Sequence, residues 1–240
     1  MHDLVIRGGT IVDGSGGERF DGDVAITDGV ISEIGTISGR GREEINALGK
    51  LVLPGWVDVH THYDGQATWD PYLKPSGNHG ITTMVMGNCG VGFAPAKPDQ
   101  HDWLIDLMEG VEDIPGAALH EGITWGWETF PEYLDKLAEM PRAVDIATQV
   151  PHGPLRVYVM GERGAKQEVA TADDLNAMSA IVEEAARAGA LGFSTSRTMV
   201  HRSISGEVVP GTFAHTDELL GIGKALGRAG HGVFEIASDM

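Results

Sequence analysis

The chain has 240 residues, 42% of them hydrophobic, which suffices for one large domain or two modest ones around a buried core. Acidic residues outnumber basic ones 35 to 17, and the formal charge of −18 disfavours nucleic acid and anionic membranes as partners. The N-terminus lacks the regions of a signal peptide, and no apolar run approaches the roughly 18 residues of a membrane-spanning helix, so we expect a cytoplasmic protein.

Short apolar alternations fill residues 4–53, separated by Gly-Gly, Asp-Gly and Gly-Ser-Gly-Gly turns. Turn residues at that spacing are typical of β-hairpins. We therefore predict a small antiparallel β unit over residues 1–54.

From residue 55 onward, strand-like apolar runs alternate with amphipathic helical patterns, as in βαβ units of a parallel sheet or barrel. Residues 55–240 are therefore expected to form the N-terminal part of a (β/α) barrel. The predicted strands cover residues 56–62, 82–89, 143–150, 191–196 and 232–237.

The clearest predicted helix covers residues 172–188, with Thr171 as N-cap and Gly189 just past its end. Two further helices are expected over about 130–140 and 217–229. The segment from residue 90 to residue 126 is too long for a simple crossover, so we expect a partly helical excursion at the barrel mouth.

A histidine pair ends the first predicted barrel strand. Strand periodicity places His60 and His62 on the same face, where two imidazoles can converge on one ion. A lone histidine is more often a satisfied core or surface residue, but burying two unpaired imidazoles is costly, so the pair favours a metal site. Asp64 follows closely, although an aspartate before a glycine is more commonly a surface loop residue.

The second barrel strand ends in a glycine-flanked cysteine, Cys89, the only cysteine in the chain. A single cysteine excludes an intramolecular disulfide, and the end of a barrel strand is where barrel enzymes place their chemistry. A buried apolar role is the alternative. A thiolate beside two imidazoles favours zinc.

Several motifs together resemble the D-aminoacylase (N-acyl-D-amino-acid deacylase) branch of the amidohydrolase superfamily. The resemblance covers essentially the whole chain, and its first two motifs are the specific ones. In chain order, the motifs are VDG at 12–14 with LPGWVDVHTHYD at 53–64, GNCG at 87–90, PHGPLR at 151–156, MG at 160–161 and GALGFSTS at 189–196. The resemblance implies a small β domain attached to a (β/α)8 TIM-type barrel. It also implies one or two zinc ions, held partly by the histidine pair and the cysteine, and hydrolysis of an amide in an N-acyl-D-amino acid or similar small substrate.

In this superfamily the general base is usually an aspartate on the last barrel strand, so the resemblance places it beyond Met240. A closed barrel of this type needs eight strands, and five are recognisable. We therefore expect the working enzyme to be longer than these 240 residues. The oligomeric state, including a homo-oligomer, stays open.

The fifth strand departs from the family pattern, which normally places a metal-binding histidine there. Ala237 or Ser238 stands near that position. Either the metal is bound with fewer protein ligands, or the substrate and reaction differ from those of D-aminoacylase. The missing histidine also supports an inactive metal-binding barrel. A further alternative is a cyclic-amide hydrolase of hydantoinase or dihydropyrimidinase type, which shares the histidine pair. Cys89 argues against the hydantoinase type, which bridges two metals with a carboxylated lysine.

Substrate contacts are predicted at two places near the active face. His152 lies at the end of the third strand, with a structural role as the alternative. The loop after the fourth strand carries Arg197, His201 and Arg202, which could hold a substrate carboxylate. Solvated surface arginines are the competing interpretation.

Overall fold

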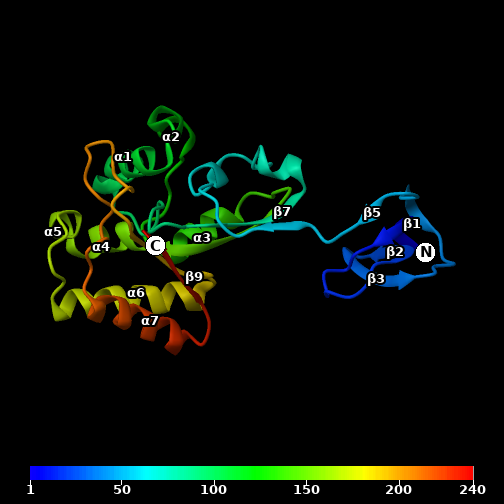
Figure 1. Ribbon diagram of the computed structural model, residues 1–240. Helices are drawn as coiled ribbons and strands as arrows, with labels where there is room; N and C mark the ends of the chain where they lie inside the picture. The colour runs from blue at the N-terminus through cyan, green and yellow to red at the C-terminus, as the bar shows by residue number, and fades with distance from the viewer. Residues whose placement is uncertain (240) are drawn as a thin grey trace. The chain divides into compact units, whose positions relative to one another are not determined.

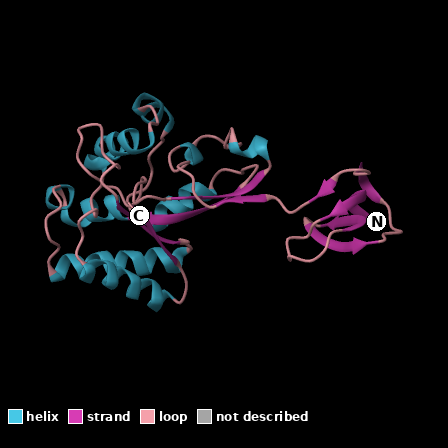
Figure 2. Ribbon diagram, viewed as in Figure 1, coloured by secondary structure: helices cyan, strands magenta, loops and turns pink. Residues whose placement is uncertain are grey.

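The structure is a computed structural model that describes residues 1–239 (Figure 1). It divides into two compact units, Met1–Gly55 and Trp56–Met240. Figure 2 shows that the first consists of strands and loops, whereas the second combines strands and helices. None of the helices in residues 1–239 is long and apolar enough to cross a membrane.

The first unit is a five-stranded sheet in the order β3-β2-β1-β4, with β5 also paired to β1. Strands β1 to β3 are antiparallel, as predicted, but β4 and β5 run parallel to β1. The expectation of an all-hairpin unit was therefore wrong for the last two strands. After β3 the chain crosses to the free edge of β1 through residues 36–40, which form no tight hairpin turn. The strands are β1 His2–Ile11, β2 Phe20–Thr27, β3 Val30–Gly35, β4 Gly41–Asn46 and β5 Leu51–Val52.

The second unit contains a five-stranded, all-parallel sheet in the order β10-β9-β8-β7-β6. Each strand overlaps one of the predicted barrel strands, and chain order equals spatial order, as in a βα barrel. The complete eight-stranded barrel stays a prediction. The strands are β6 Trp56–Asp58, β7 Ile81–Met86, β8 Asp145–Pro151, β9 Gly192–Arg197 and β10 Val233–Ser238.

The first two barrel strands are shorter than predicted. Strand β6 ends at Asp58 and β7 at Met86, so His60, His62 and Cys89 lie in the loops that follow. The Asp58 side chain accepts a hydrogen bond from the His60 backbone N–H at 3.2 Å, a local turn that competes with strand pairing. The histidines are thus brought together by a loop, and strand periodicity does not explain their common direction.

Helices pack around the parallel sheet, and α6 and α7 lie side by side (Figure 1). Helix α6 has the predicted bounds, and the segment at 90–126 is partly helical, as expected.

Helix α4 was missed because Gly153 and Pro154 resemble helix-breaking residues, although proline is tolerated in a first helical turn. The helices are α1 His101–Glu112, α2 Gly116–Gly122, α3 Phe130–Ala138, α4 His152–Met160, α5 Glu162–Ala165, α6 Ala172–Ala188 and α7 Thr216–Ala229. Short 3-10 turns cover η1 Gln66–Thr68, η2 Ser76–His79 and η3 Pro98–Gln100.

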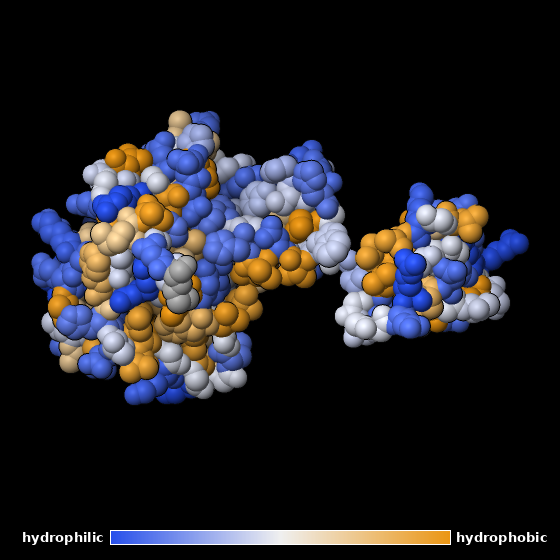
Figure 3. Space-filling model, in the orientation of Figure 1, coloured by the Kyte–Doolittle hydropathy of each residue, from blue (hydrophilic) through white to orange (hydrophobic). Residues whose placement is uncertain are grey.

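The core of the second unit lies between the sheet and these helices. It includes side chains such as Met84, Val150 and Phe193 from the strands and Met178 and Val182 from α6, all 0% exposed. Some apolar side chains stay on the surface of each unit (Figure 3). In the second unit they include Val57 on the edge strand β6 and Ile236 on the edge strand β10.

Thr171→Ala is expected to destabilise the protein by about 1 kcal/mol, because it removes the N-cap of α6. The Thr171 hydroxyl accepts a hydrogen bond from the Asp174 backbone N–H at 3.2 Å, and the Asp174 carboxylate accepts one from the Thr171 backbone N–H at 2.8 Å. Urea unfolding of the variant beside Thr171→Ser measures the effect. Serine restores the cap, so equal stability of the serine and alanine variants would contradict this assignment.

Candidate metal centre

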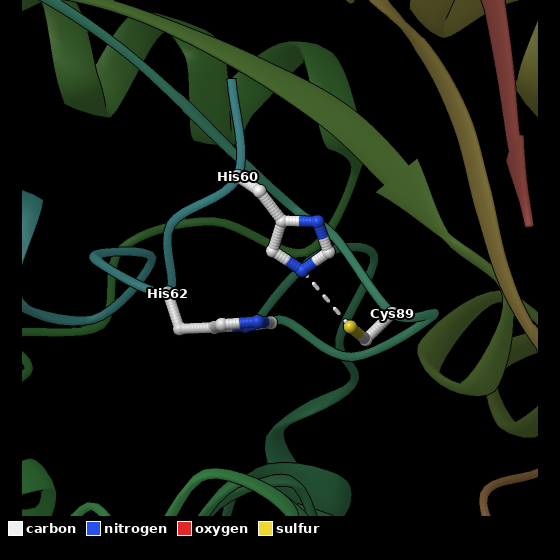
Figure 4. A group of neighbouring side chains, drawn as sticks. All are labelled: His60, His62 and Cys89. Carbon is white, nitrogen blue, oxygen red and sulfur yellow. Dashed lines mark hydrogen bonds between the residues drawn. The ribbon is translucent and has the colours of Figure 1, made fainter. Parts of the chain in front are cut away.

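Three side chains converge at the carboxyl ends of β6 and β7 (Figure 4). His60, His62 and Cys89 each offer a ligand atom, and these atoms lie within 4.8 Å of one another. The His60 Nε2 is 3.1 Å from the Cys89 Sγ. The three predicted ligands are therefore brought together, in an arrangement that could hold one metal ion.

The turn after β7 depends on glycine and on an unusual backbone at the cysteine. Gly87 and Gly90 have φ of 75° and 70°, and Cys89 itself has φ of 55°. A Cβ at Gly87 would collide with the backbone of Gln149, and one at Gly90 would collide with that of β9. Glycine is needed at both positions, and the sharp turn directs the thiol toward the histidines.

Two carboxylates that the sequence analysis missed flank the histidines. The Glu112 Oε1 at the end of α1 is 3.2 Å from the His62 Nε2, and the Glu235 Oε1 on β10 is 3.7 Å from the His60 Nδ1. For Glu235 a signal existed, because an acid stands alone in the apolar strand Val-Phe-Glu-Ile-Ala. Nothing in the sequence of α1 distinguishes Glu112 from its other acids.

Asp64 corrects an expectation, because it is not a surface loop residue but is 1% exposed. Its Oδ2 has no hydrogen-bond partner among the described residues. The loop that carries the histidines folds inward, and the buried Tyr133 hydroxyl donates to the Asp64 carbonyl at 2.8 Å. The Asp64 carboxyl is close enough to Cys89 to act on the pKa of its thiol.

Burial dominates the electrostatics of the centre. It raises the pKa of the Cys89 thiol to about 12, that of Asp64 to about 8 and that of Glu112 to about 7. It lowers the pKa of His62 to about 3, and His60 and His201 act in the same direction. The charged form of each group is thus disfavoured in the protein alone, and a bound cation would offset that penalty for the thiolate and carboxylates.

The donor set fits a zinc ion. Imidazole and thiolate are the ligands of zinc sites, and the buried His62 Nδ1 has no hydrogen-bond partner among residues 1–239. An unpaired buried polar atom is costly unless a ligand supplies a partner. Three protein ligands leave a position for a further ligand, as catalytic zinc sites require.

His152 does not face the centre. It is 0% exposed, and its two ring nitrogens contact Thr195 Oγ1 at 2.8 Å and Glu218 Oε1 at 2.7 Å. With both nitrogens engaged and no exposed surface, the side chain is not available to a substrate. The geometry favours the structural alternative for His152.

The three residues predicted in the loop after β9 separate into two groups. Arg197 donates to the Gly211 and Ala214 carbonyls, and the exposed Arg202 donates to the Gly206 carbonyl, so both hold the loop itself. His201 is half-buried, with its Nδ1 at 3.0 Å from the Ser196 Oγ. His201 also contributes to the low pKa of His62. Of the three residues, His201 is therefore the one near the candidate metal centre.

The chain is similar to known proteins over most of its length. The sequence profile of the Amidohydrolase family matches residues 43–229. The N-acyl-D-aspartate deacylase of Alcaligenes xylosoxydans xylosoxydans is 36% identical over 230 residues, 95% of this chain and 42% of that protein. This chain therefore spans less than half of that relative's length.

Two solved structures share the fold. An N-acyl-D-glutamate deacylase from Bordetella bronchiseptica, complexed with zinc and a phosphonate inhibitor, matches with a TM-score of 0.79 and 32% identity over 98% of this chain and 44% of that one. A D-aminoacylase matches with a TM-score of 0.77 and 31% identity over the same shares. The strands of this chain thus correspond to part of an amidohydrolase structure.

Proposed function

Because the chain belongs to the amidohydrolase family, we propose that the protein hydrolyses the amide bond of an N-acyl-D-amino acid or a similar small substrate, using zinc held by His60, His62 and Cys89. The convergence of two imidazoles and one thiol at the carboxyl ends of neighbouring parallel strands carries this proposal. The relatives that act on N-acyl-D-aspartate and N-acyl-D-glutamate support the substrate class.

Zinc in such a site supplies Lewis-acid activation of water and of the amide carbonyl. The residues of the chain would provide the surroundings. His62 is half-buried and Cys89 is buried, and electrostatic interactions are stronger in such surroundings than in water. His201, whose Nδ1 lies 3.0 Å from the Ser196 Oγ, would contact the polar end of the substrate.

The experiment is turnover of acyl amino acids by the purified full-length enzyme. We expect it to release amino acid from N-acetyl-D-aspartate, N-acetyl-D-glutamate or another N-acetyl-D-amino acid, faster than from the L enantiomer. Activity should disappear on chelation and return when zinc is added.

Cyclic amides and metal content separate the alternatives. Turnover of hydantoin or dihydrouracil without turnover of N-acetyl-D-amino acids would indicate a hydantoinase-type enzyme. Stoichiometric zinc without turnover of any of these compounds would indicate an inactive metal-binding barrel. Either result would contradict the proposed function.

A further inference from the structure

The fifth strand reaches the metal centre through a carboxylate. Glu235 lies on β10, at the opposite edge of the five-stranded sheet from β6, yet its Oε1 is 3.7 Å from the Nδ1 of His60. Contact between residues from opposite edges requires the sheet to curl into an open half-barrel. Glu235 pairs in register with Ser194, whose hydroxyl bonds to the turn at residues 87–90, so both side chains face the interior of that curve.

The carboxylate is held in place by buried amides. The Glu235 Oε2 accepts a hydrogen bond from the Gln149 Nε2 at 2.8 Å, and its Oε1 accepts a longer one, 3.4 Å, from the Cys89 backbone N–H. The same Gln149 nitrogen donates to Asn88 at 2.8 Å, and Asn88 donates to the Thr61 carbonyl at 3.0 Å. Gln149 and Asn88 are 3% and 1% exposed, so this support is rigid.

The two ring nitrogens of His60 face different partners. Nε2 points to the Cys89 sulfur at 3.1 Å, the side on which a metal would bind (Figure 4). Nδ1 lies 3.7 Å from the Glu235 Oε1. A neutral imidazole carries one proton on either nitrogen, and a proton on Nε2 would block metal binding. A carboxylate beside Nδ1 favours the other tautomer and increases the basicity of the ligating nitrogen.

We propose that Glu235 is a positioning residue for His60, accepting a hydrogen bond from its Nδ1–H and thereby directing the Nε2 lone pair to the metal. This inference rests on the zinc site of the proposed function. It gives the fifth strand a part in the centre without a histidine near Ala237. The strand contributes a carboxylate two residues earlier, on the same face, that acts through His60 and is not a ligand itself.

Zinc affinity tests the proposal without recourse to activity. Competition with a chromogenic chelator is measured for wild type, Glu235→Gln, Gln149→Leu and, as the matched control, Glu184→Gln on the exposed side of α6. We expect Glu235→Gln to weaken zinc binding by roughly 10-fold to 100-fold. Gln149→Leu, which keeps the charge of Glu235 but removes its anchor, should weaken binding less, and the control should match wild type.

Cobalt spectroscopy separates positioning from direct ligation and from misfolding. In the Co²⁺-loaded wild type, the His60 Nδ1–H should appear as a slowly exchanging, hyperfine-shifted proton resonance. In Glu235→Gln this proton should exchange faster, while the visible absorption of the Co²⁺ centre and the melting temperature of the metal-free protein stay as in wild type. A changed visible spectrum with unchanged proton exchange would mean that Glu235 is a ligand.

Different results would contradict the positioning role of Glu235 and the proposed zinc site. Wild-type zinc affinity in Glu235→Gln overturns the positioning role alone. Absence of zinc binding in wild type overturns the proposed function together with it. A lowered melting temperature accompanied by normal Nδ1–H exchange would assign Glu235 a structural role and overturn the inference as well.

Discussion

Replacing His60 with alanine is expected to lower zinc affinity by roughly 100-fold. Structural zinc sites with four ligands bind with about 10–16 kcal/mol, so one ligand corresponds to roughly 3 kcal/mol, or about two decades in the dissociation constant. The loss equals the upper end of the range expected for Glu235→Gln or exceeds it, because a ligand is removed and not merely reoriented. Chelator competition and metal analysis of the purified variants measure it.

The matched control and the double variant make this result decisive. His120→Ala removes an exposed histidine from α2 and should leave the zinc affinity unchanged. His60→Ala combined with Cys89→Ser should abolish stoichiometric binding. If that double variant retains its zinc, the ligand assignment is wrong.

Arg156→Met is expected to destabilise the protein by about 3–5 kcal/mol, because it leaves a buried carboxylate without its cation. Arg156 on α4 and Glu218 on α7 are 1% and 3% exposed and form an ion pair, to which His152 adds a hydrogen bond. Burial opposes ionisation of Glu218, but the contacts with His152 and Arg156 outweigh it and lower the pKa of this carboxyl. Urea unfolding gives the change in free energy.

A second substitution distinguishes this mechanism from a general packing defect. Adding Glu218→Leu to Arg156→Met removes the unpaired charge, so it should recover much of the lost stability. The exposed pair of Lys166 and Glu162 serves as the control, and Lys166→Met should leave stability unchanged. A double variant no more stable than Arg156→Met alone would contradict the buried-charge explanation.

Local sequence patterns determined the elements and the metal-binding motifs. Thr171 and Gly189 delimit α6 as expected, since capping depends on residues within one turn. The positions of the five barrel strands were also predicted, because apolar runs between turn signals identify a buried strand. The proximity of His60, His62 and Cys89 follows from the same reasoning, since the carboxyl ends of neighbouring parallel strands lie at one edge of a sheet.

Only the tertiary structure decided what surrounds those ligands. The pairing of Glu235 with His60 arises from the curl of the sheet, which no short sequence window encodes. His152 and Asp64 changed from expected roles because burial is set by segments distant in the sequence, such as α7 for His152. Local propensity acts over a few residues, whereas burial and the supports of the metal centre depend on contacts between distant residues. His152 and Glu218 are 66 positions apart, and Cys89 and Glu235 are 146 positions apart.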